Sequence, residues 1–240
     1  MSPKHHLARS DITYLTFIAL LGLFLIVMFT FFPPTTTENI PWRKTLIGSI
    51  FNTICILGSL AVFSPTQCTK ILKSKNKNNN SKLDMLVFHS KSSSMQGHHP
   101  SCGNYTAHTF RVKGRTFCAA CVGLLLGGLL ALSGSLLYFF FNWHFTEYSS
   151  LVVLVGILGV CFGLLQHKFR SLTRLTLNTA FALGTFLILI GIDEMVHSLT
   201  VDLFVVCLIL FWLFTRISLS QWDHENICSD CNVVDCEWVK

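Results

Sequence analysis

The stretch ITYLTFIALLGLFLIVMFTFF, from Ile12 to Phe32, contains no charged side chain and ends at Pro33 and Pro34. A helix needs about 20 predominantly apolar residues to cross the hydrocarbon core of a bilayer. The stretch is also too long for the apolar part of a cleaved signal peptide, which spans about 7–15 residues. We therefore expect a retained transmembrane helix here.

Further apolar runs follow along the chain. They are Leu46–Phe63, Ala119–Phe141, Leu151–Leu165, Leu175–Ile192 and Val201–Ile217. The run Leu151–Leu165 is short for a span. The composition agrees with a membrane location, since 51% of the residues are hydrophobic and only 12% are charged, against about 25% charged in soluble domains. The sequence predicts an all-α membrane protein with about six transmembrane helices.

Positive charge is distributed unevenly over the two sides of these predicted spans. Of the 18 Lys and Arg residues, only Arg43 and Lys44 fall on the side that holds the loop after the first span. Cytoplasmic loops of membrane proteins are enriched in Lys and Arg. We therefore expect a multi-pass protein of the cell membrane with both termini in the cytoplasm.

The spans and the segments between them divide the chain into regions. The segment Lys73–Lys82 is basic and of low complexity, which is typical of a disordered linker; adhesion to lipid headgroups is the less favoured interpretation. The regions are an N-terminal pair of transmembrane helices (1–66), a basic cytoplasmic linker (67–94), a Cys/His metal-binding module (95–121), a four-helix transmembrane region (119–217) and a cytoplasmic Cys-rich tail (218–240).

A first cluster of Cys and His residues precedes the span that begins at Ala119. Two residues separate His99 from Cys102, and two separate Cys118 from Cys121. Ligands at this spacing chelate one metal ion from a single tight turn, and two such pairs about 15–20 residues apart match a zinc-ribbon site. The sequence therefore predicts a zinc site whose ligands are His99, Cys102, Cys118 and Cys121, with His98 and His108 as spare candidates.

The segment between the two pairs supports a small folded module. Thr109–Val112 and Arg115–Cys118 are β-prone and flank Lys113 and Gly114, which predicts a β-hairpin. Disulfides are disfavoured in a reducing cytoplasm. A redox dithiol at Cys118 and Cys121 is a further alternative, because thiols at helix starts ionise readily, but the neighbouring candidate ligands favour a metal.

A second cluster follows the last predicted span. It consists of His224, Cys228, Cys231 and Cys236, and its compactness resembles a zinc knuckle. Both clusters are expected at the cytoplasmic face, close to the membrane. A single site shared between them, with Cys118 and Cys121 joined by Cys228 and Cys231, therefore remains an alternative to two separate sites.

The stretch HTFRVKGRTFCAACVG, from His108 to Gly123, resembles the signature of an uncharacterised prokaryotic membrane family, the domain of unknown function 2085. The resemblance covers roughly residues 95–130 and is similar to archaeal forms with a His-His-Pro start. Many members have an Arg or Gly between the two cysteines, where this chain has Ala119 and Ala120, and a Thr where this chain has Val122. These differences leave the candidate ligands intact. The resemblance implies a membrane protein with a cytoplasmic Cys/His motif and brings no activity with it.

Ionisable side chains are absent from the central part of every predicted span, which disfavours an ion pump or a proton-coupled transporter. Near the predicted outer end of the fifth span, Asp193, Glu194 and His197 are compatible with an external metal or proton site together with His144 and Glu147. A solvated helix end is the favoured interpretation, since polar neighbours at this spacing are common on helix surfaces.

Two pairs of glycines are spaced four residues apart within the predicted spans. They are Gly123 with Gly127, and Gly159 with Gly163. Such pairs present a smooth helix face that allows close packing of helices. We expect packing within one chain rather than dimerisation.

These features favour a binding or structural protein over an enzyme. We expect a bundle whose cytoplasmic face is organised by one or two structural zinc ions and docks a cytoplasmic protein partner. The alternatives are a membrane-embedded metal-dependent enzyme or thiol redox protein, and then a small-solute transporter. The sequence predicts no catalytic residues and no nucleic-acid partner, and the bilayer is the expected surroundings.

Overall fold

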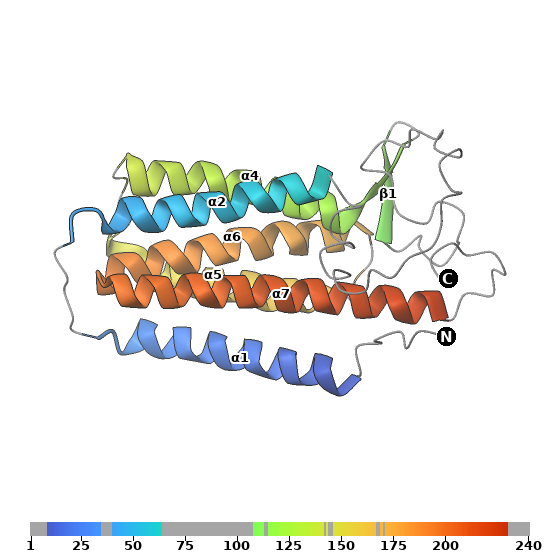
Figure 1. The fold of residues 1–240 in the computed structure, drawn as a ribbon, viewed down its shortest axis with the longest axis horizontal. Helices are drawn as coiled ribbons and strands as arrows, with labels where there is room; N and C mark the ends of the chain where they lie inside the picture. Colours follow the sequence, from blue (N-terminus) through green and yellow to red (C-terminus); the bar gives the residue numbers. More distant parts are fainter. Residues whose placement is uncertain are drawn as a thin grey trace, which may run out of the picture.

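The computed structural model describes residues 9–34, 40–63, 108–112, 115–141, 143, 146–166, 169 and 171–229. In this part of the chain, helices lie side by side in an elongated bundle with one β-hairpin at an end (Figure 1). The elements are α1 (Arg9–Phe31), α2 (Arg43–Phe63), β1 (Thr109–Val112), β2 (Arg115–Cys118), α4 (Ala119–Phe140), the short 3-10 helix η2 (Thr146–Tyr148), α5 (Ser149–Leu164), α6 (Ser171–Val196) and α7 (Leu199–Ser229).

The helices have the lengths and compositions that a membrane requires. Five of those described, α1, α2, α4, α6 and α7, are long and apolar enough to cross a bilayer, and α5 is a shorter apolar helix of 16 residues. Their outer faces carry large apolar side chains such as Phe17, Leu57 and Leu158, each about half exposed or more. Apolar helices in this number indicate a multi-pass membrane protein, which confirms the predicted all-α membrane class.

Successive helices run in opposite directions, so the connections gather at the two ends of the bundle. The start of α1, the end of α2, the hairpin and the end of α7 lie at one end, which we term the hairpin end (Figure 1). The start of α2, the end of α4 and the α6–α7 turn at His197 and Ser198 lie at the other, which we term the turn end. This alternation matches the side assignment made from the Lys and Arg distribution.

Glycines allow α6 to lie close to both α4 and α5. A Cβ atom on Gly127 of α4 would be 2.7 Å from the carbonyl oxygen of Thr179, and one on Gly159 of α5 would be 2.6 Å from that of Ala180. Gly123 and Gly163 also face α6. Both predicted glycine pairs therefore pack within the chain, as expected.

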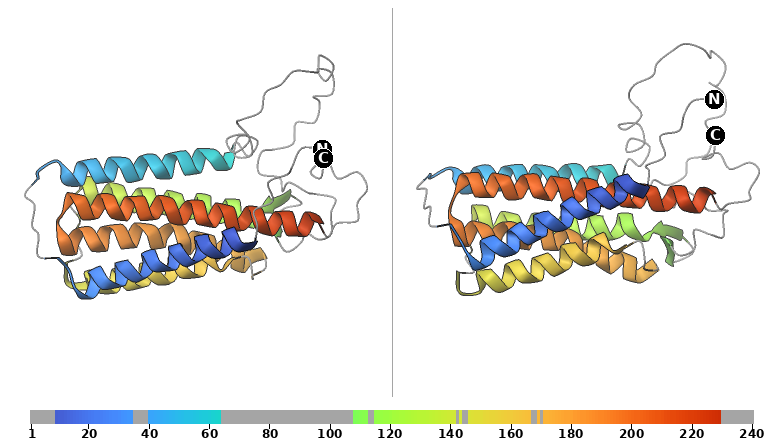
Figure 2. Two further views of the ribbon diagram at one scale, coloured as in Figure 1. Left: turned by 60° about the horizontal axis from the view of Figure 1, so that its bottom comes forward. Right: turned by 90° about the horizontal axis from the view of Figure 1, so that it is seen from below.

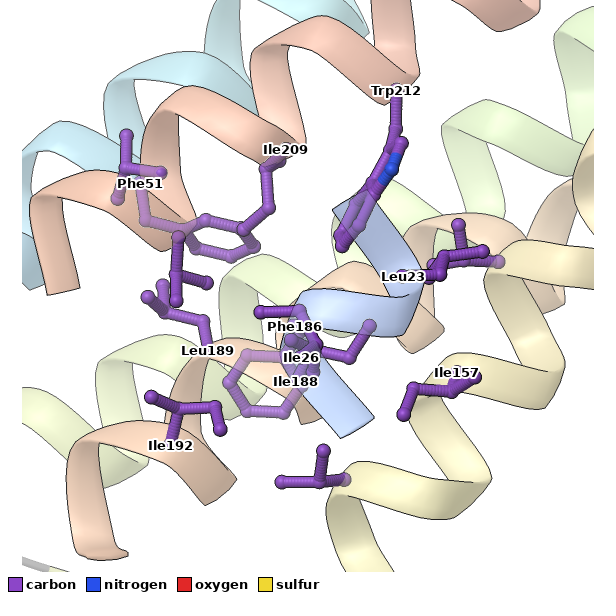
Figure 3. Close-up of a cluster of buried hydrophobic side chains, with 14 of the residues drawn as sticks. Leu23, Ile26, Phe51, Ile157, Phe186, Ile188, Leu189, Ile192, Ile209 and Trp212 are labelled. Atoms are coloured by element: carbon purple, nitrogen blue, oxygen red, sulfur yellow. The ribbon is translucent and has the colours of Figure 1, made fainter. Parts of the chain in front are cut away.

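An apolar core joins α1 and α2 to this central part. Trp212 of α7 is fully buried, and its Nε1 donates a hydrogen bond of 3.0 Å to the carbonyl oxygen of Ala19 on α1. Leu23 and Ile26 of α1 and Phe51 of α2 belong to the same buried cluster (Figure 3). Two further views show α1 crossing the outside of the bundle at an angle (Figure 2).

The last two helices extend beyond the apolar runs that predict them. Helix α6 begins at Ser171 and ends at Val196, and α7 continues past Ile217 to Ser229. An apolar run identifies only the part of a helix that lies inside the hydrocarbon core. The turns of α7 beyond Ile217 are polar, so the run does not include them. The region assigned to a cytoplasmic tail from residue 218 therefore begins as a continuation of α7, and its segment 230–240 lies outside the described residues.

Candidate functional site at the hairpin end

The hairpin forms where the sequence predicts it. Strands β1 and β2 pair antiparallel with Thr109 opposite Cys118 and Val112 opposite Arg115. The rings of Phe110 and Phe117 pack across the strands with 5.9 Å between their centroids. The Oγ of Ser171, at the start of α6, donates a hydrogen bond of 3.0 Å to the carbonyl oxygen of Thr109. The hairpin is thereby attached to the end of the bundle.

Cys118 and Cys121 lie at the junction between this hairpin and a transmembrane helix. Cys118 ends β2 and has an extended backbone immediately before α4, and Cys121 lies in the first turn of α4. Both side chains are half-buried. The N-terminal end of a helix carries a partial positive charge, so this position favours the thiolate form of a cysteine.

The two thiols face a small cavity of about 100 Å³. Its wall combines thiol, imidazole, guanidinium and hydroxyl groups with two apolar side chains. The lining residues are His108, Cys118, Ala120, Cys121, Leu124, Arg174, Arg216 and Ser220. They come from the hairpin, α4, α6 and α7, so the cavity exists only in the folded bundle.

One side of the cavity is held by a hydrogen-bonded chain through Arg174 of α6, which is 3% exposed. Its Nη2 donates to Oδ2 of Asp223 on α7 at 2.6 Å, and its Nη1 donates to Nδ1 of His108. Burial, followed by the charge of Arg174, lowers the pKa of His108 to about 4, although Asp223 acts in the opposite direction. His108 is therefore a neutral acceptor at physiological pH.

The other side of the cavity is formed by Arg216 of α7, which is 5% exposed. It is bound to Asn178, a neutral amide, and in the described part of the chain it forms no ion pair with a carboxylate. Negative charge on Cys121 and Cys118 interacts favourably with this guanidinium. The arrangement can therefore stabilise anionic sulfur next to the membrane.

The predicted zinc ligands are brought together only in part. Cys118, Cys121 and the spare candidate His108 line one cavity. His224 and Cys228 lie on the last turns of α7 rather than in a loop after it. The remaining candidates, His98, His99, Cys102, Cys231 and Cys236, lie outside the described residues.

The donors in the cavity do not complete a zinc site by themselves. Among the described residues, no three His, Cys, Asp or Glu side chains are grouped so that they could hold a metal ion. His108 already accepts a hydrogen bond from Arg174 at Nδ1, whereas a zinc-bound histidine normally donates from its second nitrogen. Cys118 and Cys121 thus fit a zinc ion only if further ligands come from outside the described residues.

Sequence reasoning missed the basic residues of this site. The distribution of Lys and Arg places Arg174 and Arg216 with the cytoplasmic charges, but both are buried between helices. Asn178, a polar residue within the apolar run Leu175–Ile192, is the partner of Arg216. The available signal was the position of Arg216 inside an apolar run, since an ionisable residue there usually has a specific partner.

A second cluster of charged residues lies at the turn end, and there the favoured sequence interpretation is wrong. Asp193 and Asp202 are fully buried, and Asp193 pairs with Arg43 at 2.6 Å. The expected solvated helix end is thus a packed ion-pair network. Arg43, at the start of α2, supplies the counter-charge from a distant part of the sequence, which helical spacing alone does not reveal.

Comparisons of the chain with protein-family models, with curated proteins and with solved structures found no match. Membership of the domain of unknown function 2085 therefore stays a prediction from the His108–Gly123 motif.

Proposed function

We propose that this chain is a multi-pass protein of the cell membrane, with both termini in the cytoplasm, whose hairpin end holds a structural zinc ion and serves as a docking face for a cytoplasmic protein. The observation that carries the proposal is the position of Cys118 and Cys121. Both are half-buried at the start of α4 and share a cavity with the buried guanidinium of Arg216.

Charge balance supports a zinc–thiolate centre at this position. Zn²⁺ with three thiolates and one neutral imidazole carries one net negative charge. Asp223 balances the charge of Arg174. Arg216 has no such carboxylate partner among the described residues. The negative charge of a site formed by His99, Cys102, Cys118 and Cys121 would balance Arg216.

The chain order supports the same ligand set. Cys102 precedes His108, a residue of the cavity wall, by six positions. Six residues of extended chain span up to about 20 Å, so the His99–Cys102 pair is within reach of the cavity. The hairpin ends at Cys118, which itself lines the cavity. A zinc ion bound in this way would fasten the hairpin to the bundle.

A second candidate function is a thiol redox centre. It is favoured by the absence of a third metal ligand among the described side chains around Cys118 and Cys121. A pair of cysteines at a helix start beside a cation is also a suitable environment for a reactive thiolate. In that case the pair would cycle between dithiol and disulfide and bind no metal.

Metal content separates these functions. The detergent-purified protein would be measured by elemental mass spectrometry together with the double variant Cys118→Ser/Cys121→Ser. Cys207→Ser, which removes an exposed thiol from the outer face of α7, is the matched control. We expect zinc in the wild type and in the control and none bound at this site in the double variant.

The variant Cys228→Ser/Cys231→Ser tests the second cluster in the same measurement. Loss of a second, separate zinc would indicate two sites, and loss of the same zinc would indicate one shared site. A wild-type protein without metal whose Cys118 and Cys121 thiols are titrated reversibly by a glutathione buffer would contradict the zinc site and support the redox function.

A further inference from the structure

The charged cluster at the turn end, independent of the hairpin-end site, is built from four helices. Arg43 and Lys44 begin α2, Tyr138 lies near the end of α4, Asp193 and Glu194 lie near the end of α6, and Asp202 lies in the first turn of α7. Asp193 and Asp202 are 0% exposed and Arg43 is 4% exposed. Charged groups buried to this degree require close partners.

A single nitrogen of Arg43 serves two carboxyl groups. Nη1 donates to Oδ1 of Asp193 at 2.6 Å and also to Oδ2 of Asp202. Because Asp193 and Asp202 contact the same nitrogen atom, their carboxyl groups lie close together. Two carboxylates cannot form a hydrogen bond unless one of them carries a proton, because an ionised carboxylate is only an acceptor.

Tyr138 is placed in the same way between two acids. Its hydroxyl oxygen is 2.6 Å from Oδ2 of Asp193 and 2.7 Å from Oε2 of Glu194. A phenol has one hydrogen to donate, so it fully satisfies only one of these acceptors. Lys44 Nζ lies 3.8 Å from the same two carboxyl oxygens and 4.8 Å from the centre of the Tyr138 ring.

Arg43 supplies one positive charge to two fully buried aspartates. Asp193 and Asp202 contact the same guanidinium nitrogen, and Asp202 forms no other ion pair with a residue that the structure describes. Oδ1 of Asp202 is buried and accepts no hydrogen bond. A proton on one of the two aspartates would remove their mutual repulsion, and this unpartnered carboxyl oxygen is present to receive it.

We propose that Asp193 and Asp202 hold one exchangeable proton between them, so that the cluster is a buried proton-binding site. A metal ion is a poor alternative, since no three acidic, His or Cys side chains of the described residues are grouped to hold one. The other titratable groups described at this end, Glu147 of η2 and His197 of the α6–α7 turn, are exposed. Helix α5 contains no acidic or basic side chain.

The proton couples helix packing to pH at the turn end. With the proton bound, Arg43, Asp193 and Asp202 together carry no net charge, and Arg43 joins α2 to α6 and α7. Loss of the proton leaves two buried carboxylates that repel each other. Because the folded protein holds a proton that the unfolded chain releases at neutral pH, the free energy of unfolding falls as the pH rises.

Infrared spectroscopy of the full-length protein in detergent tests this directly. A protonated carboxyl group has a C=O stretching band that an ionised carboxylate lacks and that shifts in D₂O. The band would be recorded at neutral pH and in mildly alkaline buffer for the wild type, Asp202→Asn and Asp193→Asn. Asp11→Asn, which changes an exposed aspartate of α1, is the matched control.

We expect a band in the wild type and in Asp11→Asn at neutral pH, its loss at alkaline pH, and its absence from both cluster variants. Asparagine can donate the hydrogen bond that the shared proton provides, so Asp202→Asn should remain folded and lose the alkaline fall in thermal stability. A wild-type spectrum without the band, or a band that persists in both cluster variants, would overturn the proposal. Should one variant fail to fold, the wild-type spectrum and the other variant still decide the outcome.

Discussion

Arg216 on α7 donates two hydrogen bonds to one atom, Oδ1 of Asn178 on α6, from Nη2 and from Nε at 2.9 Å. Asn178 is fully buried, and its Nδ2 donates to the carbonyl oxygen of Arg174 at 2.6 Å. A buried cation is thereby oriented by a neutral amide toward the cavity that Cys118 and Cys121 line. The pair links the packing of two helices to the electrostatics of the candidate site.

Replacing Asn178 should therefore destabilise the bundle. Asn178→Leu leaves the buried guanidinium of Arg216 without its acceptor, and hydrogen bonds to charged groups contribute about 1.5–3 kcal/mol. We expect the free energy of unfolding in detergent to fall by about that amount. Thr176→Leu, at an exposed position two residues away on the same helix, should change it little.

Removing the cation together with its acceptor should restore much of this loss. In the double variant Asn178→Leu/Arg216→Leu, no buried charge is left unsatisfied, and apolar replacement of both partners is often close to neutral. A double-mutant cycle of unfolding free energies measures the coupling. Additive effects of the two single changes would contradict the direct interaction.

Gly127 should be intolerant of any side chain. An alanine Cβ would lie 2.7 Å from the Thr179 carbonyl oxygen and 2.9 Å from the Cβ of Ala182, so α4 and α6 would have to separate. We expect Gly127→Ala to cost about 1–3 kcal/mol of unfolding free energy. At Gly58 of α2 a Cβ meets nothing within 4 Å, so Gly58→Ala should be neutral or stabilising, as alanine favours helices over glycine by about 1 kcal/mol. Equal effects at the two positions would argue against close packing of α4 on α6.

Trp212 should be a principal contact between α1 and α7. Its side chain is fully buried and bonded to the Ala19 carbonyl. Trp212→Ala should cost about 3–5 kcal/mol of unfolding free energy through loss of burial, and Trp212→Phe should cost less because the ring remains. Trp42→Ala removes a tryptophan that is 56% exposed and is the control. A wild-type unfolding midpoint for Trp212→Ala would show that α1 packs elsewhere.

Removal of zinc should loosen the hairpin without dissolving the transmembrane bundle. The helices bury their own core, whereas the hairpin is bound to the bundle by few described contacts, among them the Ser171–Thr109 hydrogen bond. Treatment with a chelator should therefore increase hydrogen exchange in residues 108–118 and leave α6 protected. The same treatment of Cys118→Ser/Cys121→Ser should have no further effect. Unchanged exchange in the chelated wild type would be the contrary result.

Much of the fold is predictable from the sequence because the bilayer is a demanding solvent. The run Ile12–Phe32 is long and uncharged, and α1 spans nearly the same residues. The hairpin was also predictable to the residue, since β-prone segments flank Lys113 and Gly114. Helix ends were less predictable, because the polar last turns of α7 lie beyond the reach of a hydropathy criterion.

The sequence by itself determined the membrane class, the apolar helices and the position of the Cys118–Cys121 pair at a helix start, because these depend on local length, composition and spacing. Only the tertiary structure decided which charged residues are buried and with whom they pair. Arg43 contacts Asp193 and Asp202 across 150 and 159 positions of sequence, and Arg216 meets Asn178 across 38. Such pairs form because a polar group that helix packing shields from water must bond to another polar group. No local pattern in the sequence records which helix supplies that partner.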